Sequence, residues 1–252
     1  SDRGMRRILI SIVVAAVFLS LAVPAGAAPY DEIMQRWQKT QRFGDAGDAL
    51  SVSATYFSSE YIEALMQSEA DKNLWTADEM DLHKYQLLKT LRLDDTIPVR
   101  FRFDIMGSAI HMAPFGEQVT LWIKGKKYKP VDYDPLLNFK VADTAEGMVY
   151  FPRFDEKTGK DLLAGAGTIK LELSGSISMT IKRTKVDFIW DVAADDPSRV
   201  YSGQAGGRLE MDRLIKRLAN LNKEKQECEK KLDELNSEIA NIEMRMKELQ
   251  QQ

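Results

Sequence analysis

The chain has few of the residues that build disulfide frameworks and metal centres. Its 252 residues include two histidines, His83 and His111, and one cysteine, Cys228. A single cysteine excludes an intrachain disulfide, and neither histidine belongs to a spacing typical of zinc ligands. The formal net charge of −3 gives no electrostatic reason to expect a nucleic-acid partner. The sequence therefore predicts no metal, no cofactor and no nucleic acid.

Motifs of catalysis are also scarce. The segment "EKTGKD" (156–161) lacks the leading glycine and the hydroxyl residue of a phosphate loop, so a charged hairpin tip is favoured. Asp132 and Asp134 could offer oxygens to calcium, but no longer acidic loop surrounds them. No nucleophile-elbow pattern is present. The sequence favours a non-enzymatic protein and predicts no catalytic, cofactor-binding or metal-binding residue.

Residues 1–27 have the layout of a secretory signal peptide. Two arginines precede an apolar run over 8–23, and Pro24 and small residues follow it. The run is short for a membrane span, which needs about 20 residues. Small side chains at Ala25 and Ala27 suit cleavage after Ala27. We expect a periplasmic or secreted protein that meets the membrane only through this segment, before cleavage.

The next part of the chain predicts a helix followed by a strand. Residues 28–48 form an N-terminal segment in which Ile33 and Trp37 lie on one side of a helix over 30–43, which the glycines of 44–48 end. From Leu50 to Tyr56, apolar and polar residues then alternate, as in a half-buried strand.

A helical insertion is predicted over about 60–91, in two pieces. Thr76 and Glu79 have the spacing of a capping box, with Trp75 and Met80 placed as a hydrophobic staple. The second helix should therefore begin at residue 77. His83 is expected at the edge of its packed face.

Beyond Pro98 the pattern changes to the alternation of β-strands. Six to eight short strands with no helices between them favour an antiparallel sheet pair. We interpret 49–192 as an immunoglobulin-like antiparallel β-sandwich that carries the helical insertion, with Trp122 or Trp190 anchoring the core. Strands are expected over 99–105, 119–124, around 128, and over 148–151, 168–174, 177–181 and 186–192.

This succession resembles a group of bacterial exported domains. The resemblance rests on "ATYFSSEYIEAL", the helical segment, "VTLWIKGKKYKPVDYDP" and "VYFPRFD", and it covers about 50–192. It implies the immunoglobulin-like fold with a helical insertion. It implies no activity and no catalytic residues.

Residues 193–207, with one proline and three glycines, are predicted to be a linker, and 208–252 a coiled coil. A 3-4 spacing of apolar residues runs for more than five heptads without proline or glycine. Lys225 is the one charged residue of the seam. The a positions are Met211, Leu218, Lys225, Leu232, Ile239 and Met246, and the d positions are Leu214, Leu221, Cys228, Leu235, Ile242 and Leu249.

Cys228 at a d position is either a small apolar filler or an interchain disulfide. A parallel homodimer would bring the two cysteines together, but it would set Glu224 against Glu229. An antiparallel homodimer makes every g-position pair complementary, six exposed pairs worth about 2 to 3 kcal/mol at low salt. The charges favour the antiparallel form.

These features predict an exported envelope protein whose β-domain is a binding or scaffold module. Its coiled coil would join it to further copies of itself or to an envelope partner, because an isolated helix cannot hide such a seam. The alternative is a small-ligand carrier or an enzyme. Its site would lie between the insertion and the sandwich and use residues such as His83, His111, Asp132 or Asp134.

Overall fold

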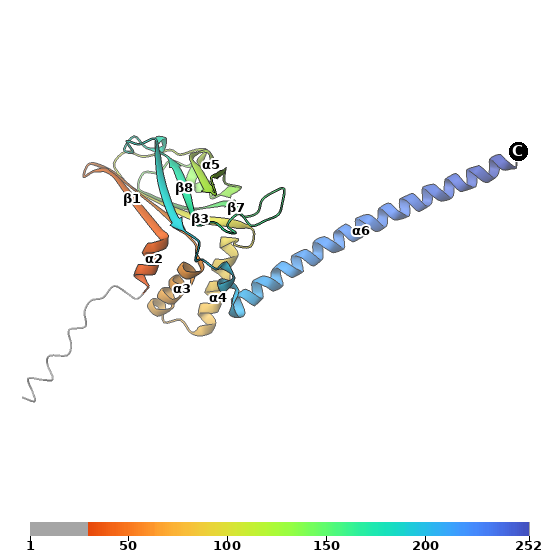
Figure 1. The fold of residues 1–252 in the computed structure, drawn as a ribbon, viewed down its shortest axis with the longest axis horizontal. Helices are drawn as coiled ribbons and strands as arrows, with labels where there is room; N and C mark the ends of the chain where they lie inside the picture. The colour runs from red at the N-terminus through yellow and green to blue at the C-terminus, as the bar shows by residue number, and fades with distance from the viewer. Residues whose placement is uncertain (1–29, 252) are drawn as a thin grey trace, which may run out of the picture.

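The computed structural model describes residues 30–251. It has a body of two antiparallel sheets with helices α3 (Ser59–Asn73) and α4 (Ala77–Leu91) at one end. A single long helix, α6 (Gly203–Gln250), projects from this end of the body (Figure 1). The predicted signal peptide and its cleavage site lie outside the described residues.

The strands form two sheets. The five-stranded sheet has the order β1-β2-β3-β7-β6, the four-stranded sheet has the order β5-β4-β8-β9, and every pairing is antiparallel. The strands are β1 (Gln38–Asp45), β2 (Asp48–Tyr56), β3 (Thr96–Met106), β4 (Val119–Ile123), β5 (Lys126–Tyr128), β6 (Asp132–Tyr133), β7 (Thr144–Pro152), β8 (Thr168–Ser174) and β9 (Lys185–Asp191).

One apolar core lies between the sheets. Phe101 of β3 meets Phe188 of β9 edge to face, with ring centroids 6.3 Å apart. Trp190 of β9 is buried against Tyr56 of β2, whereas Trp122 lies on the outer face and bonds to a glutamate. The predicted combination of antiparallel β-structure with helices and a long C-terminal helix is confirmed. The immunoglobulin-like identity of the sheet pair stays a prediction.

The predicted N-terminal helix is wrong in its second half. Helix α2 (Asp31–Trp37) ends at Trp37, and the next eight residues form β1, which pairs with β2 along its whole length. The backbone oxygen of Trp37 accepts a 2.8 Å hydrogen bond from Nε1 of Trp190, which fixes the end of the helix in the core. The glycines at 44–48 turn a hairpin. Pairing with β2 thus overrides a weak local helix pattern.

The helical insertion is confirmed as two helices, α3 (Ser59–Asn73) and α4 (Ala77–Leu91). Thr76 and Glu79 form the predicted capping box, in which each side chain bonds to the other residue's backbone N–H. Helix α4 therefore begins at the expected residue.

The predicted strand over 177–181 is wrong. After β8 the chain forms a short 3-10 helix, η2 (Gly175–Ile177), which the Ser174 side chain caps. Met179, in the middle of this segment, is 98% exposed. Gly175 explains the break: a Cβ atom there would lie 1.8 Å from the backbone oxygen of Arg183, so the chain folds back on itself more closely than a strand allows.

The prediction of a linker over 193–207 is also wrong. A 3-10 helix, η3 (Pro197–Tyr201), packs the wholly buried Val200 into the core, and α6 (Gly203–Gln250) begins directly after it. Proline at the first turn and glycine at a tight approach both suit this arrangement. Two further short helices are α5 (Phe115–Gln118) and η1 (Pro135–Asn138). Among the described residues, no helix is long and apolar enough to cross a membrane.

Candidate interaction helix

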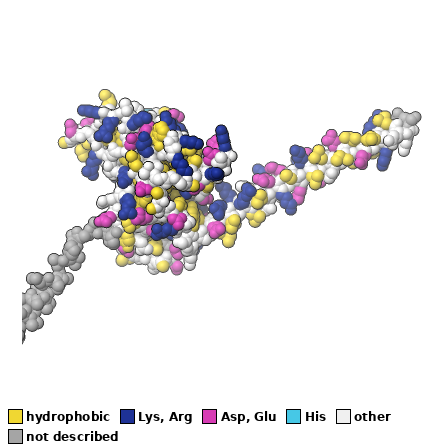
Figure 2. All heavy atoms as spheres, in the orientation of Figure 1, with side chains coloured by type: hydrophobic (Ala, Val, Ile, Leu, Met, Phe, Trp, Pro, Cys, Tyr) yellow, Lys and Arg dark blue, Asp and Glu magenta, His cyan; other side chains and the backbone are white. Residues whose placement is uncertain are grey.

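Helix α6 carries an uncovered apolar stripe. Ten of its twelve a and d residues, from Met211 to Leu249, are leucine, isoleucine or methionine, and these ten are between 43% and 59% exposed. Figure 2 shows hydrophobic side chains spaced along the projecting helix among charged ones. The stripe consists of the predicted seam residues: Met211, Leu214, Leu218, Leu221, Lys225, Cys228, Leu232, Leu235, Ile239, Ile242, Met246 and Leu249.

The base of α6 is held by its opposite face. Ala205 and Gly206 are buried, Leu209 packs against the core, and Asp212 accepts a hydrogen bond from the Tyr85 hydroxyl of α4. At about 100° per residue, these four positions centre on the side of the helix opposite the a and d positions. The stripe therefore faces away from the body from Met211 onward.

Gly206 allows this close attachment. A Cβ atom at Gly206 would lie 1.8 Å from the backbone oxygen of Tyr201, so the helix could not approach η3 with any side chain there. A Cβ atom at the adjacent Gly207 would meet nothing within 4 Å. The two glycines thus differ: one is required by packing, and the other faces open space.

Ion pairs within α6 support the helix but leave its stripe uncovered. Lysines pair with glutamates four residues later, as Lys223 does with Glu227 and Lys230 with Glu234. Such exposed pairs contribute about 0.3 to 0.5 kcal/mol each, less in the Lys-to-Glu order than in the reverse. Most stabilisation of an amphipathic helix comes from burying its apolar face, which α6 does not do within one chain.

The middle of the stripe differs from its ends. Lys225 has a side chain 72% exposed and contacts Glu229 at 3.7 Å, and Cys228 is a free, exposed cysteine. These residues interrupt the run of leucines, isoleucines and methionines between Leu221 and Leu232. A polar position in a coiled-coil core lowers stability but fixes register and helix number.

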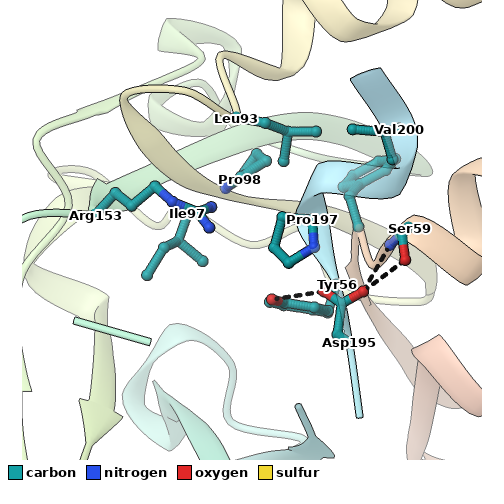
Figure 3. Close-up of a pocket in the computed structure, with 10 residues that line it drawn as sticks. Tyr56, Ser59, Leu93, Ile97, Pro98, Arg153, Asp195, Pro197 and Val200 are labelled. Carbon is teal, nitrogen blue, oxygen red and sulfur yellow. Dashed lines mark hydrogen bonds between the residues drawn. The ribbon is translucent and has the colours of Figure 1, made fainter. Parts of the chain in front are cut away.

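A polar cluster lies where the sheets meet α3 and η3 (Figure 3). The Asp195 carboxylate accepts 2.9 Å hydrogen bonds from the backbone N–H and the hydroxyl of Ser59, and a longer one of 3.5 Å from Tyr56. Nε of Arg153, itself only 8% exposed, lies 3.1 Å from a carboxylate oxygen of Asp161. Tyr56, Arg153, Asp161 and Asp195 also line a neighbouring pocket of about 410 Å³, which is not the one drawn in Figure 3.

The polar groups of this cluster are bonded to one another within the chain. Burial, and then the nearby Asp195 carboxylate, raise the pKa of Tyr56 well above its usual value, so the phenol keeps its proton. The Asp195 carboxylate accepts its hydrogen bonds from Ser59 in the first turn of α3, and Arg153 pairs with Asp161. The cluster therefore ties the segment before α6 to the start of α3.

The four residues named for an alternative site are held in separate interactions. His83 stacks on Trp75 with ring centroids 3.9 Å apart, and His111 is exposed in a loop. Asp132 pairs with Arg92 at 2.9 Å, and Asp134 caps η1 through the N–H of Leu136. They do not form one site. No cluster of three or more histidine, cysteine or acidic residues suited to a metal occurs in the part of the chain that is described.

The segment over 156–161 forms the tip of a hairpin, as predicted. Phe154 and Asp161 pair across it, and the Asp155 carboxylate accepts hydrogen bonds from the N–H groups of Lys157 and Thr158. These two backbone bonds lower the pKa of Asp155. The backbone donors of the turn are thus used by the chain's own carboxylate.

Sequence patterns did not reveal the polar cluster. Tyr56, Arg153 and Asp195 lie far apart in the sequence, and no motif relates them. The one local signal is the run of Asp195, Asp196 and Pro197, typical of a capped turn, since the Asp196 carboxylate bonds to the N–H of Ser198.

Comparison with known proteins adds little. No protein-family model matches the chain, and no curated protein matches it. A solved structure, that of a novel protein of unknown function from Burkholderia pseudomallei K96243, has 10% sequence identity and a TM-score of 0.36. The match covers 68% of this chain and 83% of that chain. A likeness at this TM-score carries no argument about fold or function.

Proposed function

We propose that this protein is an exported, non-enzymatic envelope protein in which α6 joins the two-sheet body, a binding or scaffold module, to a partner helix. The partner is a further copy of the chain or another envelope protein. Export is proposed from the signal-like sequence of residues 1–27, and the joining role from the stripe of α6.

The observation that carries the proposal is the direction of the stripe. Its apolar residues face away from the body, and they continue to Leu249 near the helix end. Contiguous exposed apolar surface on this scale marks an interaction site in soluble proteins. A heptad spacing selects helices as the partner, because only a helix presents side chains that fit between those of the a and d positions.

The test is a paired substitution in the stripe. Leu232→Asp/Leu235→Asp places charges at adjacent a and d positions and should convert the mature chain, residues 28–252, to a monomer in sedimentation equilibrium. If the partner is another protein, the same variant should lose it in pull-down from envelope extracts.

The matched control is Ser237→Asp/Ala240→Asp. It adds the same charge at the same spacing on the outer face of α6 and should leave mass and binding unchanged. A wild-type chain that is monomeric, binds nothing through α6 and behaves like the Leu232→Asp/Leu235→Asp variant would contradict the proposal.

A second candidate function is a small-ligand carrier or an enzyme. The pocket bordered by Tyr56, Arg153 and Asp195 supports it, since this pocket brings buried polar side chains together with the backbone of residues 163–167. Thermal shift against metals, amino acids and sugar phosphates tests it. A ligand that raises the unfolding temperature of wild type but not of Arg153→Met would favour this function, and indifference to the whole set would oppose it.

A further inference from the structure

We infer that the helix covering the stripe is α6 of a second copy of this chain, running antiparallel to the first. This inference rests on the proposed function, because it names the partner of the same stripe. It is carried by three features of α6: the charges beside the stripe, the order of the apolar residues within it and the open space beside Gly207 at its base.

The charges beside the stripe are complementary in the antiparallel arrangement. With a two-fold axis between Gln226 and Glu227, g positions face g positions and e positions face e positions. All of the charged residues involved are exposed in the single chain. The axis sets Glu210 beside Arg245 of the second copy, Arg217 beside its Glu238, Glu224 beside its Lys231, and Arg208 beside its Glu243.

This register also pairs the apolar residues with one another. Each a residue packs beside a d residue of the second copy, and the one charged core position, Lys225, lies beside Cys228 rather than beside another lysine. The apolar layers are Met211 with Ile242, Leu214 with Ile239, Leu218 with Leu235, and Leu221 with Leu232, each formed twice across the axis.

The base of α6 has room for the far end of the second helix. In this register Met246 of the second copy reaches Gly207, where a Cβ atom would meet nothing within 4 Å. The body contacts the opposite face, through Ala205, Gly206 and Asp212. The face of α6 that would receive Met246 of the second copy is therefore not the face that the body occupies.

A parallel dimer fits these residues less well. It would place Lys225 against Lys225 in the core, Glu224 against Glu229, and Glu238 against Glu243, with no complementary pair to offset them. The antiparallel form removes all three like-charge contacts. It also sets the two bodies at opposite ends of the paired helices.

Cysteine cross-linking in the full mature chain tests the inference. In a Cys228→Ser background, Leu221→Cys and Leu232→Cys are made singly and together, and disulfide formation under mild oxidation is read on non-reducing gels. Antiparallel pairing brings residue 221 to residue 232 of the second copy. The double variant should then form covalent dimers while each single variant stays monomeric on the gel.

An intrachain link cannot imitate this result. Residues 221 and 232 are about 16 Å apart along one helix, far beyond the reach of a disulfide. Covalent dimers from the single variants would show parallel pairing and overturn the inference. Small-angle scattering provides a second readout, because bodies at opposite ends give a longer particle than bodies side by side.

Failure of the inference is distinguishable from failure of the proposed function. A parallel dimer abolished by Leu232→Asp/Leu235→Asp would overturn the antiparallel pairing and support the joining role. A wild-type chain that sediments as a monomer would overturn the second copy as partner. Only a chain that also binds no other protein through α6 would contradict both.

Discussion

Tyr56 connects the core of the sheets to the helices. Its ring packs between Trp37 and Trp190, with centroid distances of 5.5 Å and 5.9 Å, and its hydroxyl faces Asp195. A phenol so placed can lose its proton only by putting a charge beside a carboxylate inside the core. Its environment thus has a consequence for stability at high pH.

The pKa of Tyr56 is raised in the folded chain, whereas in the unfolded chain the phenol has the usual tyrosine pKa of about 10. The contribution of the protonated phenol to the free energy of unfolding is therefore complete below about pH 10 and falls as the pH rises above that value. Between about pH 10 and pH 11 the free energy of unfolding should fall more steeply in wild type than in Tyr56→Phe. The difference in slope is up to about 1.4 kcal/mol per pH unit. Urea unfolding followed by tryptophan fluorescence measures it.

The comparison belongs in the monomeric Leu232→Asp/Leu235→Asp background, so that dimer dissociation does not enter. Measurements near pH 7, where the phenol is protonated in both folded and unfolded chains, give the baseline difference between the variants. Parallel curves above pH 10 would show that Tyr56 ionises freely.

At the residue scale, some side-chain roles follow from the sequence and others do not. The capping box of Thr76 and Glu79 was predictable because it depends on residues three apart. The bond between Asp195 and Ser59 was not, because it joins residues 136 apart. The two neighbouring glycines, Gly206 and Gly207, are identical in the sequence and differ only in what surrounds them.

At the scale of the elements, the charged g-position residues beside the stripe of α6 lead to a specific prediction. Glu238→Arg should weaken an antiparallel dimer, because it faces Arg217 of the second copy. In a parallel dimer it would face Glu243 and strengthen the complex. Two contacts per dimer change from attraction to repulsion, which raises the Kd about tenfold at low salt. Sedimentation at several concentrations measures the effect.

The rescue variant is Arg217→Glu/Glu238→Arg. It restores opposite charges at both contacts of the antiparallel form, so its Kd should return to the wild-type range, and added salt should reduce the effects of both variants. Tighter association of Glu238→Arg alone would contradict the antiparallel arrangement.

Element boundaries followed from the sequence where the local pattern was strong. Strand β3 alternates from residue 99 onward without error, and it covers the predicted 99–105, but it begins three residues earlier, at Thr96, and includes Pro98. Residues 38–45 alternate weakly, and their strand depends on pairing with β2, which lies beyond a turn. The seam of α6 was predictable because heptads repeat along one helix, whereas the packing of η3 depends on contacts with α3.

In the whole molecule, the boundary between the body and the projecting helix lies within α6 rather than before it. The first turns of the helix belong to the body through Ala205, Leu209 and Asp212. From Arg213 to Gln250 every residue of the helix is exposed. The sequence indicated the boundary at the glycines, because glycine marks flexible segments more often than close packing.

Truncation tests this division. A chain ending at Lys216 should unfold at the same temperature as the monomeric Leu232→Asp/Leu235→Asp variant. A chain ending at Asp196 loses the buried Val200 and the 2.9 Å pair of Arg199 with Glu63. Loss of the valine alone costs about 1.5 to 3 kcal/mol, which lowers Tm by roughly 3 to 12 °C. Equal unfolding temperatures for the two truncated chains would place the boundary before η3.

Because α6 is attached to α4 near its base, a small change of angle there becomes a large displacement at the far end of the helix. Its 48 residues span about 72 Å, and only the first few turns are fixed to the body (Figure 1). A tilt of about 5° at the Tyr85–Asp212 contact therefore swings the tip, which lies about 57 Å further along the helix, by about 5 Å, close to the rise of one helical turn. The angle at which α4 meets the helix base sets where the far end of the molecule points.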